Sequence, residues 1–247
     1  MTPTPMIEFR NLVKRFGSRT ILKGLNLSIN QGEILFILGT SGTGKSVLLK
    51  NIVGLMRPDE GSIWIEGKEV SKYTEEQYFE VRKFCGMVFQ QPALFDSITV
   101  FENVAFGLRR HFKMTDAEIA ARVSESLKLV QLHDIEAKFS YEISYGMQKR
   151  VSLARTIALR PKILLFDEPT TGLDPITTNS INKLILDLSR ELKTTSIVVS
   201  HDMKCAFEIA DRIVVLDKGQ IVDSGTPAEL RKSREPLVVD FLSEIDL

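Results

Sequence analysis

The stretch Gly39-Thr40-Ser41-Gly42-Thr43-Gly44-Lys45-Ser46 decides the fold of this 247-residue chain. It follows the apolar run Ile34–Leu38 and precedes an apolar helix start at Val47, which is the order strand, phosphate loop, helix. Glycines let backbone N–H groups turn inward, and the helix N-terminus adds partial positive charge. The pattern predicts a cradle for a nucleoside triphosphate, with Lys45 on the β- and γ-phosphates and Ser46 on Mg²⁺. A chance glycine-rich turn is the alternative.

A second buried-strand pattern ends in two adjacent carboxylates, within Lys162-Ile163-Leu164-Leu165-Phe166-Asp167-Glu168-Pro169. Open α/β sheets bind ligands at the carboxyl ends of their strands. Neighbouring side chains of a strand point in different directions. We therefore expect Asp167 to hold Mg²⁺ and Glu168 to face an attacking water as a general base. The alternative is a solvated acidic turn.

The stretch Glu142-Ile143-Ser144-Tyr145-Gly146-Met147-Gln148-Lys149-Arg150 resembles the signature sequence of ABC-type ATPases, written Leu-Ser-Gly-Gly and then Gln or Met in that family. The resemblance extends from about Ile7 to about Ser224. It implies an α/β fold of the P-loop NTPase, ABC ATPase type, with a mainly parallel core sheet, an N-terminal antiparallel β part and an inserted helical subdomain. It also implies ATP hydrolysis, with ATP and Mg²⁺ as cofactors.

Four further motifs occur in the family's order. Phe16 resembles the aromatic residue that stacks on adenine, and Gln90 resembles the glutamine that senses the metal and the attacking water. Asp174, in Gly172-Leu173-Asp174, resembles the loop that crosses to the partner subunit. His201 resembles the γ-phosphate histidine, and a neutral imidazole can donate to a phosphate oxygen. Taken alone, Phe16 is an ordinary core aromatic and Gln90 a polar residue at a strand end.

The resemblance defines the predicted site residue by residue. The predicted catalytic residues are Lys45, Gln90, Glu168 and His201. The predicted Mg²⁺ ligands are Ser46, Gln90 and Asp167. The predicted ATP-binding residues are Phe16, Gly39, Thr40, Ser41, Gly42, Thr43, Gly44, Lys45, Ser46, Val47, Ser144 and Gly146. The dimer loop is assigned to Asp174.

Tyr145 departs from the family pattern, because it stands where the signature usually has its first glycine. In the family, the signature serine and glycines cap the γ-phosphate of a nucleotide held by the other subunit. Ser144 and Gly146 remain to donate, but a phenol needs room and constrains φ where glycine does not. The ring either packs away from the nucleotide or slows closure. We predict an active enzyme with reduced turnover.

Two segments resemble the Mla/Mce-type lipid transport ATPases: the run from Ala93 to Phe106 and the run from Gly172 to Thr177. This resemblance implies phospholipid as the cargo. ABC ATPases for amino acids and other small solutes share many of these motifs, so they stay open as an alternative. A nucleotide-binding module with little turnover because of Tyr145 is a further alternative. A DNA-repair or translation ATPase would need a coiled-coil insertion or a second ATPase domain. A small-molecule kinase has no use for a signature sequence.

Composition limits the partners. Lys+Arg and Asp+Glu number 32 each, so we expect no nucleic acid. The two cysteines, Cys85 and Cys205, form no metal pattern and are expected in the core. We read His111 and His133 as surface residues. The N-terminal residues 1–6 lack the features of a secretory signal.

The apolar runs are too short to cross a bilayer, which takes about 20 residues. A separate integral membrane permease must therefore supply the path. We expect a head-to-tail homodimer on the cytoplasmic face of the inner membrane, with lipid-binding accessory subunits as further partners.

The domain organisation is predicted as one ABC ATPase domain, 6–247, with a nucleotide-binding core at 6–89 and 161–225, a helical subdomain at 91–160 and a helical tail at 226–247. Within the core we expect the phosphate-loop helix to reach about Leu55. Thr115 and Glu118 form a predicted capping box for one helix of the subdomain. The tail, with apolar residues at helical spacing, is expected to pack on its own domain, and exchange onto the partner subunit is the alternative.

Overall fold

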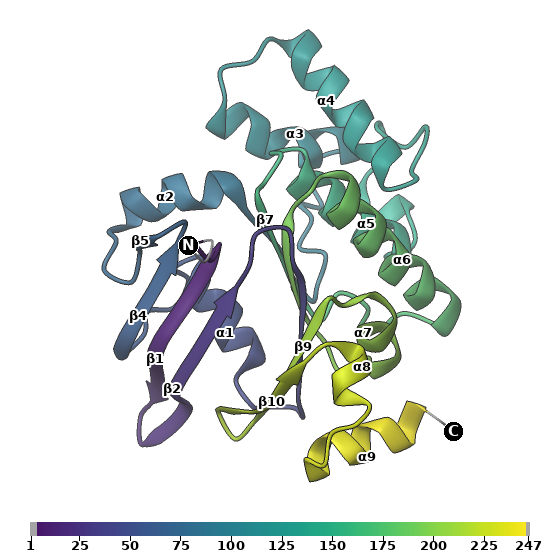
Figure 1. The fold of residues 1–247 in the computed structure, drawn as a ribbon. Coiled ribbons are helices and arrows are strands. Elements are labelled where there is room, and N and C mark those ends of the chain that lie inside the picture. The colour runs from purple at the N-terminus through teal and green to yellow at the C-terminus, as the bar shows by residue number, and fades with distance from the viewer. Residues whose placement is uncertain (1–3, 246–247) are drawn as a thin grey trace. The chain divides into compact units, whose positions relative to one another are not determined.

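The computed structural model describes residues 4–245 (Figure 1). Residues 1–3, part of the segment predicted to carry no secretory signal, and residues 246–247 of the predicted tail lie outside the described residues. The chain divides into two compact units. The first runs up to Arg82 and resumes at Thr194, and the second is Lys83–Lys193.

The first unit contains an antiparallel sheet in the order β2-β1-β4-β5. Its strands are β1 (Ile7–Phe16), β2 (Arg19–Ile29), β4 (Glu60–Ile65) and β5 (Lys68–Glu69). Burial alternates along the ends of β4 and β2, as expected for a sheet with one face on the core. This is the predicted N-terminal antiparallel part.

The first unit also contains a parallel group of strands. β3 (Ile34–Leu38) pairs in parallel with β8 (Thr195–Val199) and with β9 (Arg212–Asp217), while β10 (Gln220–Gly225) pairs antiparallel with β9. All residues of β3 and β8 are buried, because parallel strands are covered on both faces. The helices that complete this part are α7 (Met203–Ile209), α8 (Pro227–Leu230) and α9 (Pro236–Ile245). The tail helix α9 lies against α7 of its own chain and buries Val238.

Two helices of the first unit differ from the sequence expectation. α1 (Lys45–Ile52) ends before Leu55. Gly54 takes a positive φ, its N–H bonds the Asn51 carbonyl, and Leu55 N–H bonds the Lys50 carbonyl, which is the Schellman way of ending a helix.

The helix α2 (Glu75–Phe84) was not predicted. It buries only Tyr78 and Val81, so its sequence carries almost no apolar periodicity. Its position is fixed instead by Gly54, where a Cβ would stand 2.5 Å from the Tyr78 ring.

The second unit is mostly helical. Its elements are β6 (Cys85–Val88), α3 (Val100–His111), α4 (Asp116–Leu129), a 3-10 turn (Ser140–Glu142), α5 (Tyr145–Ile157), β7 (Ile163–Asp167) and α6 (Pro175–Glu191). Helices α3, α4 and α5 pack against one another (Figure 1). The predicted capping box is present: Thr115 accepts from Glu118 N–H, and the Glu118 carboxylate accepts from Thr115 N–H. β6 and β7 pair in parallel.

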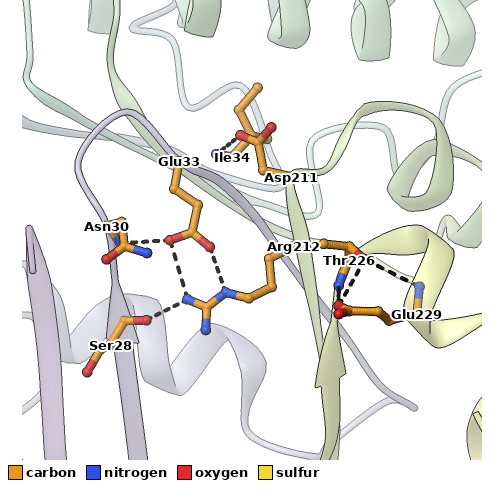
Figure 2. Close-up of polar contacts among 8 residues, drawn as sticks. All are labelled: Ser28, Asn30, Glu33, Ile34, Asp211, Arg212, Thr226 and Glu229. Carbon is orange, nitrogen blue, oxygen red and sulfur yellow. Dashed lines mark hydrogen bonds and ion pairs between the residues drawn. The ribbon is translucent and has the colours of Figure 1, made fainter.

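A nearly buried carboxylate ties the start of β3 to the start of β9 in the first unit. Figure 2 shows Glu33 accepting from the Asn30 N–H at 2.7 Å and from the Arg212 guanidinium at 2.6 and 3.3 Å. The Asp211 carboxylate beside it accepts from the Ile34 N–H at 2.8 Å. Glu33 is 9% exposed, so its bonds are shielded from water and compete less with it. Together these contacts hold β3 in register with β9.

We predict that Glu33→Gln lowers the free energy of unfolding by about 1.5–3 kcal/mol, the range for hydrogen bonds to charged groups. Urea unfolding followed by circular dichroism measures this. The matched control is Glu8→Gln, which breaks the exposed Glu8–Arg10 pair and should leave the midpoint nearly unchanged. Equal midpoint shifts in the two variants would show that the buried Glu33 carboxylate stabilises the fold no more than an exposed one does.

Candidate nucleotide site

The phosphate loop leaves the carboxyl end of β3 and enters α1, as the sequence predicts. Gly44 is the N-cap of α1 and has no side chain to occupy the first-turn amides. Lys45 is buried, and its Nζ donates to the carbonyls of Gly39 at 2.7 Å and Thr40 at 3.0 Å. The Thr43 hydroxyl also donates to the Thr40 carbonyl, at 3.0 Å. The lysine is therefore held across the loop, on the side that the helix N-terminus faces.

The geometry of the loop fits phosphate groups. A Cβ on Gly39 would stand 2.2 Å from the Leu216 carbonyl oxygen, and one on Gly44 would stand 2.8 Å from Leu22 Cδ2. The backbone is thus closely packed at Gly39 and Gly44, and a glycine-rich loop that enters a helix N-terminus suits an anion. Gly42 has φ +79°, and a Cβ built on it meets no protein atom within 4 Å, so within the protein it favours glycine for its backbone conformation.

The site suits a magnesium ion that is held partly by the phosphate groups of the nucleotide. In residues 4–245 there is no cluster of three or more His, Cys, Asp or Glu that could hold a metal ion. Mg²⁺ prefers oxygen ligands and binds through one or two carboxylates together with substrate phosphates. The predicted ligands Ser46 and Asp167 offer a hydroxyl and a carboxylate, and when bound the ion would neutralise phosphate charge.

His201 leaves the same edge of the first unit as the phosphate loop. Ile37 of β3 lies in register with Val199 of β8, and the Ser200 N–H bonds the Ile37 carbonyl. His201 follows directly and is exposed. The parallel register therefore places the predicted γ-phosphate histidine beside the phosphate loop.

Phe16 ends β1 and is 47% exposed, so it is not the core aromatic that its sequence position alone allows. It pairs with Arg19 at the turn into β2, and the Lys14 ammonium lies 5.5 Å from its ring centroid. Further along β2, Leu22 contacts Gly44 of the phosphate loop. An accessible ring face on this hairpin suits stacking on a base.

In the second unit, Gln90 and the acidic pair also leave one edge. Val88 of β6 lies in register with Phe166 of β7. Gln90 is exposed, Asp167 is 6% exposed, and Glu168 is half-buried with φ +50°. A positive φ at a non-glycine residue is strained and turns the side chain away from the strand direction. The two carboxylates therefore have different surroundings.

The signature and the dimer loop line one open concavity of about 710 Å³ in the second unit. Ser144 is the N-cap of α5 and accepts from the Met147 N–H at 3.3 Å. Asp174 is the N-cap of α6 and accepts from Ile176 and Thr177 N–H at 3.0 Å. The Thr177 hydroxyl and these amides lower the pKa of Asp174. The other lining residues include Tyr145, Gly146, Arg150, Gly172 and Leu173.

Tyr145 occupies the glycine position without backbone strain, because it is the first helical residue of α5 and is not among the residues with positive φ. Its ring packs beside the Gly172 loop, where a Cβ would stand 3.5 Å from Tyr145 Cε1. The backbone here is one that any residue adopts, so tyrosine is accommodated in this conformation without strain.

The remaining singled-out residues have structural roles. Cys85 and Cys205 are buried, as predicted, and burial raises the pKa of Cys85 to about 12. His133 is exposed, whereas His111 is half-buried at the end of α3. The prediction of a surface position is therefore wrong for His111, because a residue that ends an amphipathic helix still packs on its neighbours.

A family profile described as ABC transporter matches residues 22–171. The chain belongs to the ABC transporter family. This family assignment covers the phosphate loop, the signature and the acidic pair, and it includes ATP hydrolysis with ATP and Mg²⁺. In residues 4–245, no helix of this ABC protein is both long and apolar enough to span a bilayer.

The names of relatives of this ABC protein refer to different transported substrates. The probable ribonucleotide transport ATP-binding protein mkl of Mycobacterium leprae is 42% identical over 237 residues, 96% of this chain and 68% of that protein. The Fe(3+) ions import ATP-binding protein FbpC of Escherichia coli is 40% identical over 248 residues, 100% of this chain and 70% of that protein. The chain thus spans about two thirds of the length of such curated relatives.

Among solved structures, the dimeric post-hydrolysis state of the ATP-binding cassette MJ0796, bound to ADP and Pi, superimposes with a TM-score of 0.83 at 33% identity. The match covers 90% of this chain and 99% of that chain. The predicted ABC ATPase fold is therefore confirmed.

We predict that Gly39→Ala weakens ATP binding by at least about tenfold, because the added methyl meets a backbone oxygen that cannot move cheaply. Titration calorimetry with Mg-ATP measures the dissociation constant. Gly42→Ala is the matched control: the protein has space for the methyl group there, and the variant bears the strain of positive φ, about 1–2 kcal/mol. Equal affinities of the two variants would contradict the fit described for the loop.

Proposed function

We propose that two copies of this chain face head to tail and clamp each ATP between the phosphate loop of one copy and the Ser144 concavity of the other. The observation that carries this proposal is the concavity itself. Ser144 and Gly146 at the start of α5 and Asp174 at the start of α6 line one open space, whose size is within the usual range for ligand sites. The dimeric MJ0796 cassette supports the arrangement by similarity.

In this arrangement the chain's own groups divide the chemistry. Lys45 and the loop amides bind the β- and γ-phosphates, and His201 donates to the γ-phosphate. Ser46, Asp167 and Gln90 orient the metal-bound phosphates. Glu168 accepts a proton from the attacking water, with its side chain turned by the positive φ. Closure lasts while the γ-phosphate is intact, because only the closed dimer neutralises its charge.

We predict that Glu168→Gln lowers ATP hydrolysis by about 100- to 10,000-fold while ATP binding survives, because the amide cannot accept the proton. Lys45→Ala is the paired variant, which should lose binding instead. Saturating Mg-ATP at 100 times its dissociation constant should stabilise the wild type and Glu168→Gln by about 2.7 kcal/mol, and Lys45→Ala much less. Wild-type turnover in Glu168→Gln would remove this residue from the role of base.

We propose further that closure drives a separate integral membrane permease on the cytoplasmic face of the inner membrane, and that the cargo is phospholipid. Phe95 and Phe106 of the helical region are 46% and 47% exposed, and their ring centroids lie 4.9 Å apart. An exposed aromatic pair is costly in water and suits a protein partner. The likeness of 93–106 and 172–177 to lipid transport ATPases supports the lipid cargo, and lipid-binding accessory subunits would complete the assembly.

We predict that the tagged chain, purified from detergent-solubilised membranes, brings down a permease with bound phospholipid, identified by mass spectrometry. Phe95→Ser should reduce the recovered permease several-fold, because the pair with Phe106 is broken, while ATP binding is kept. Tyr141→Ser removes another exposed aromatic and is the control. A permease that carries no lipid, and whose ATPase responds to an amino acid or another small solute, would favour the small-solute alternative.

A further inference from the structure

The phenol of Tyr145 makes a contact that a glycine signature cannot make. Its hydroxyl donates to Gln91 Oε1 at 3.1 Å. The ring is half-buried and borders the Gly172 loop. One side chain thus bridges the start of α5 and the residue that follows Gln90, and it also touches the loop that leads to Asp174.

Lys149 lies one helical turn after Tyr145 and faces the same way, as i and i+4 residues do. It is 3% exposed. Its ammonium donates to the Gln90 carbonyl and lies 5.5 Å from the Tyr145 ring centroid. Burial lowers the pKa of Lys149. The Gln90 carbonyl and the Tyr145 ring face both stabilise the buried ammonium charge.

Arg155, further along α5, contacts the same segment from another side of the helix. Its guanidinium donates to the Ala93 carbonyl at 2.8 Å and to the Pro92 carbonyl at 3.1 Å. Three side chains of one helix therefore bind four consecutive residues, 90–93. Because this segment has no regular secondary structure, the contacts with α5 fix its position.

We propose that Tyr145 and Lys149 are positioning residues that fasten the Gln90 segment to the signature end of α5, so that Gln90 and Ser144 move as one piece. The tyrosine is then a working substitute for glycine in this chain. When the triphosphate held by the partner copy binds Ser144, the position of Gln90 is then set through two hydrogen bonds, from Tyr145 to Gln91 and from Lys149 to Gln90. This inference rests on the proposed function, which assigns Gln90 to the metal and the water.

The experiment is a double-mutant cycle with Tyr145→Phe and Gln91→Ala, which remove the donor and the acceptor of the same bond. Hydrogen–deuterium exchange without nucleotide should rise about 2- to 10-fold over residues 88–96 in either single variant, the equivalent of one lost hydrogen bond. kcat should fall by a similar factor, and KM for ATP should stay within about twofold, because the phosphate loop is untouched. The Mg²⁺ concentration for half-maximal rate should rise. The double variant should be no worse than either single variant.

Tyr141→Phe is the matched control, since Tyr141 is 71% exposed in the adjacent 3-10 turn and should change none of these quantities. Unchanged exchange in Tyr145→Phe, effects that multiply in the double variant, or an equal Mg²⁺ shift in Tyr141→Phe would each overturn the proposal. A wild-type chain without ATPase activity would instead refute the proposed function, and the exchange data would still decide whether Tyr145 holds the segment.

Discussion

The parallel register of buried strands is the constraint on which both halves of the site depend. In the first unit, the pairing of Ile37 with Val199 brings the phosphate loop and His201 to one edge. In the second, the pairing of Val88 with Phe166 does the same for Gln90 and the acidic pair. These strands are mostly buried, and the polar site residues follow their carboxyl ends. Burial of the strands therefore forces the chemistry to their carboxyl ends.

Helix α5 organises the second unit around this edge. Ser144 caps it, Tyr145 and Lys149 hold the Gln90 segment, and Arg155 binds the carbonyls that follow. Gly172 keeps the neighbouring loop close to the Tyr145 ring. Because these contacts lie within one compact unit, the signature and the glutamine segment form a single structural piece, and they carry any displacement together.

The sequence predicts most of the fold because its strands and caps are local signals. The phosphate loop, the Thr115 capping box and the strand ending at Asp167 are all readable without tertiary contacts. Helix α2 is not, because Tyr78 and Val81 are its only buried residues and Gly54 fixes its place from a distant segment. The role of Lys149 is likewise hidden, although its spacing of four from Tyr145 is a signal that could have indicated a shared face. The bond to Gln91 joins residues 54 apart in the chain, which no local pattern encodes.

Sedimentation velocity of Glu168→Gln with and without Mg-ATP tests the central claim most directly, because this variant should retain the γ-phosphate that holds the two copies together. We predict a monomer without nucleotide and a dimer with saturating Mg-ATP, reverting when the nucleotide is removed. A variant that binds ATP with full occupancy and yet remains monomeric at every protein concentration would contradict the proposal that the triphosphate is clamped between two copies.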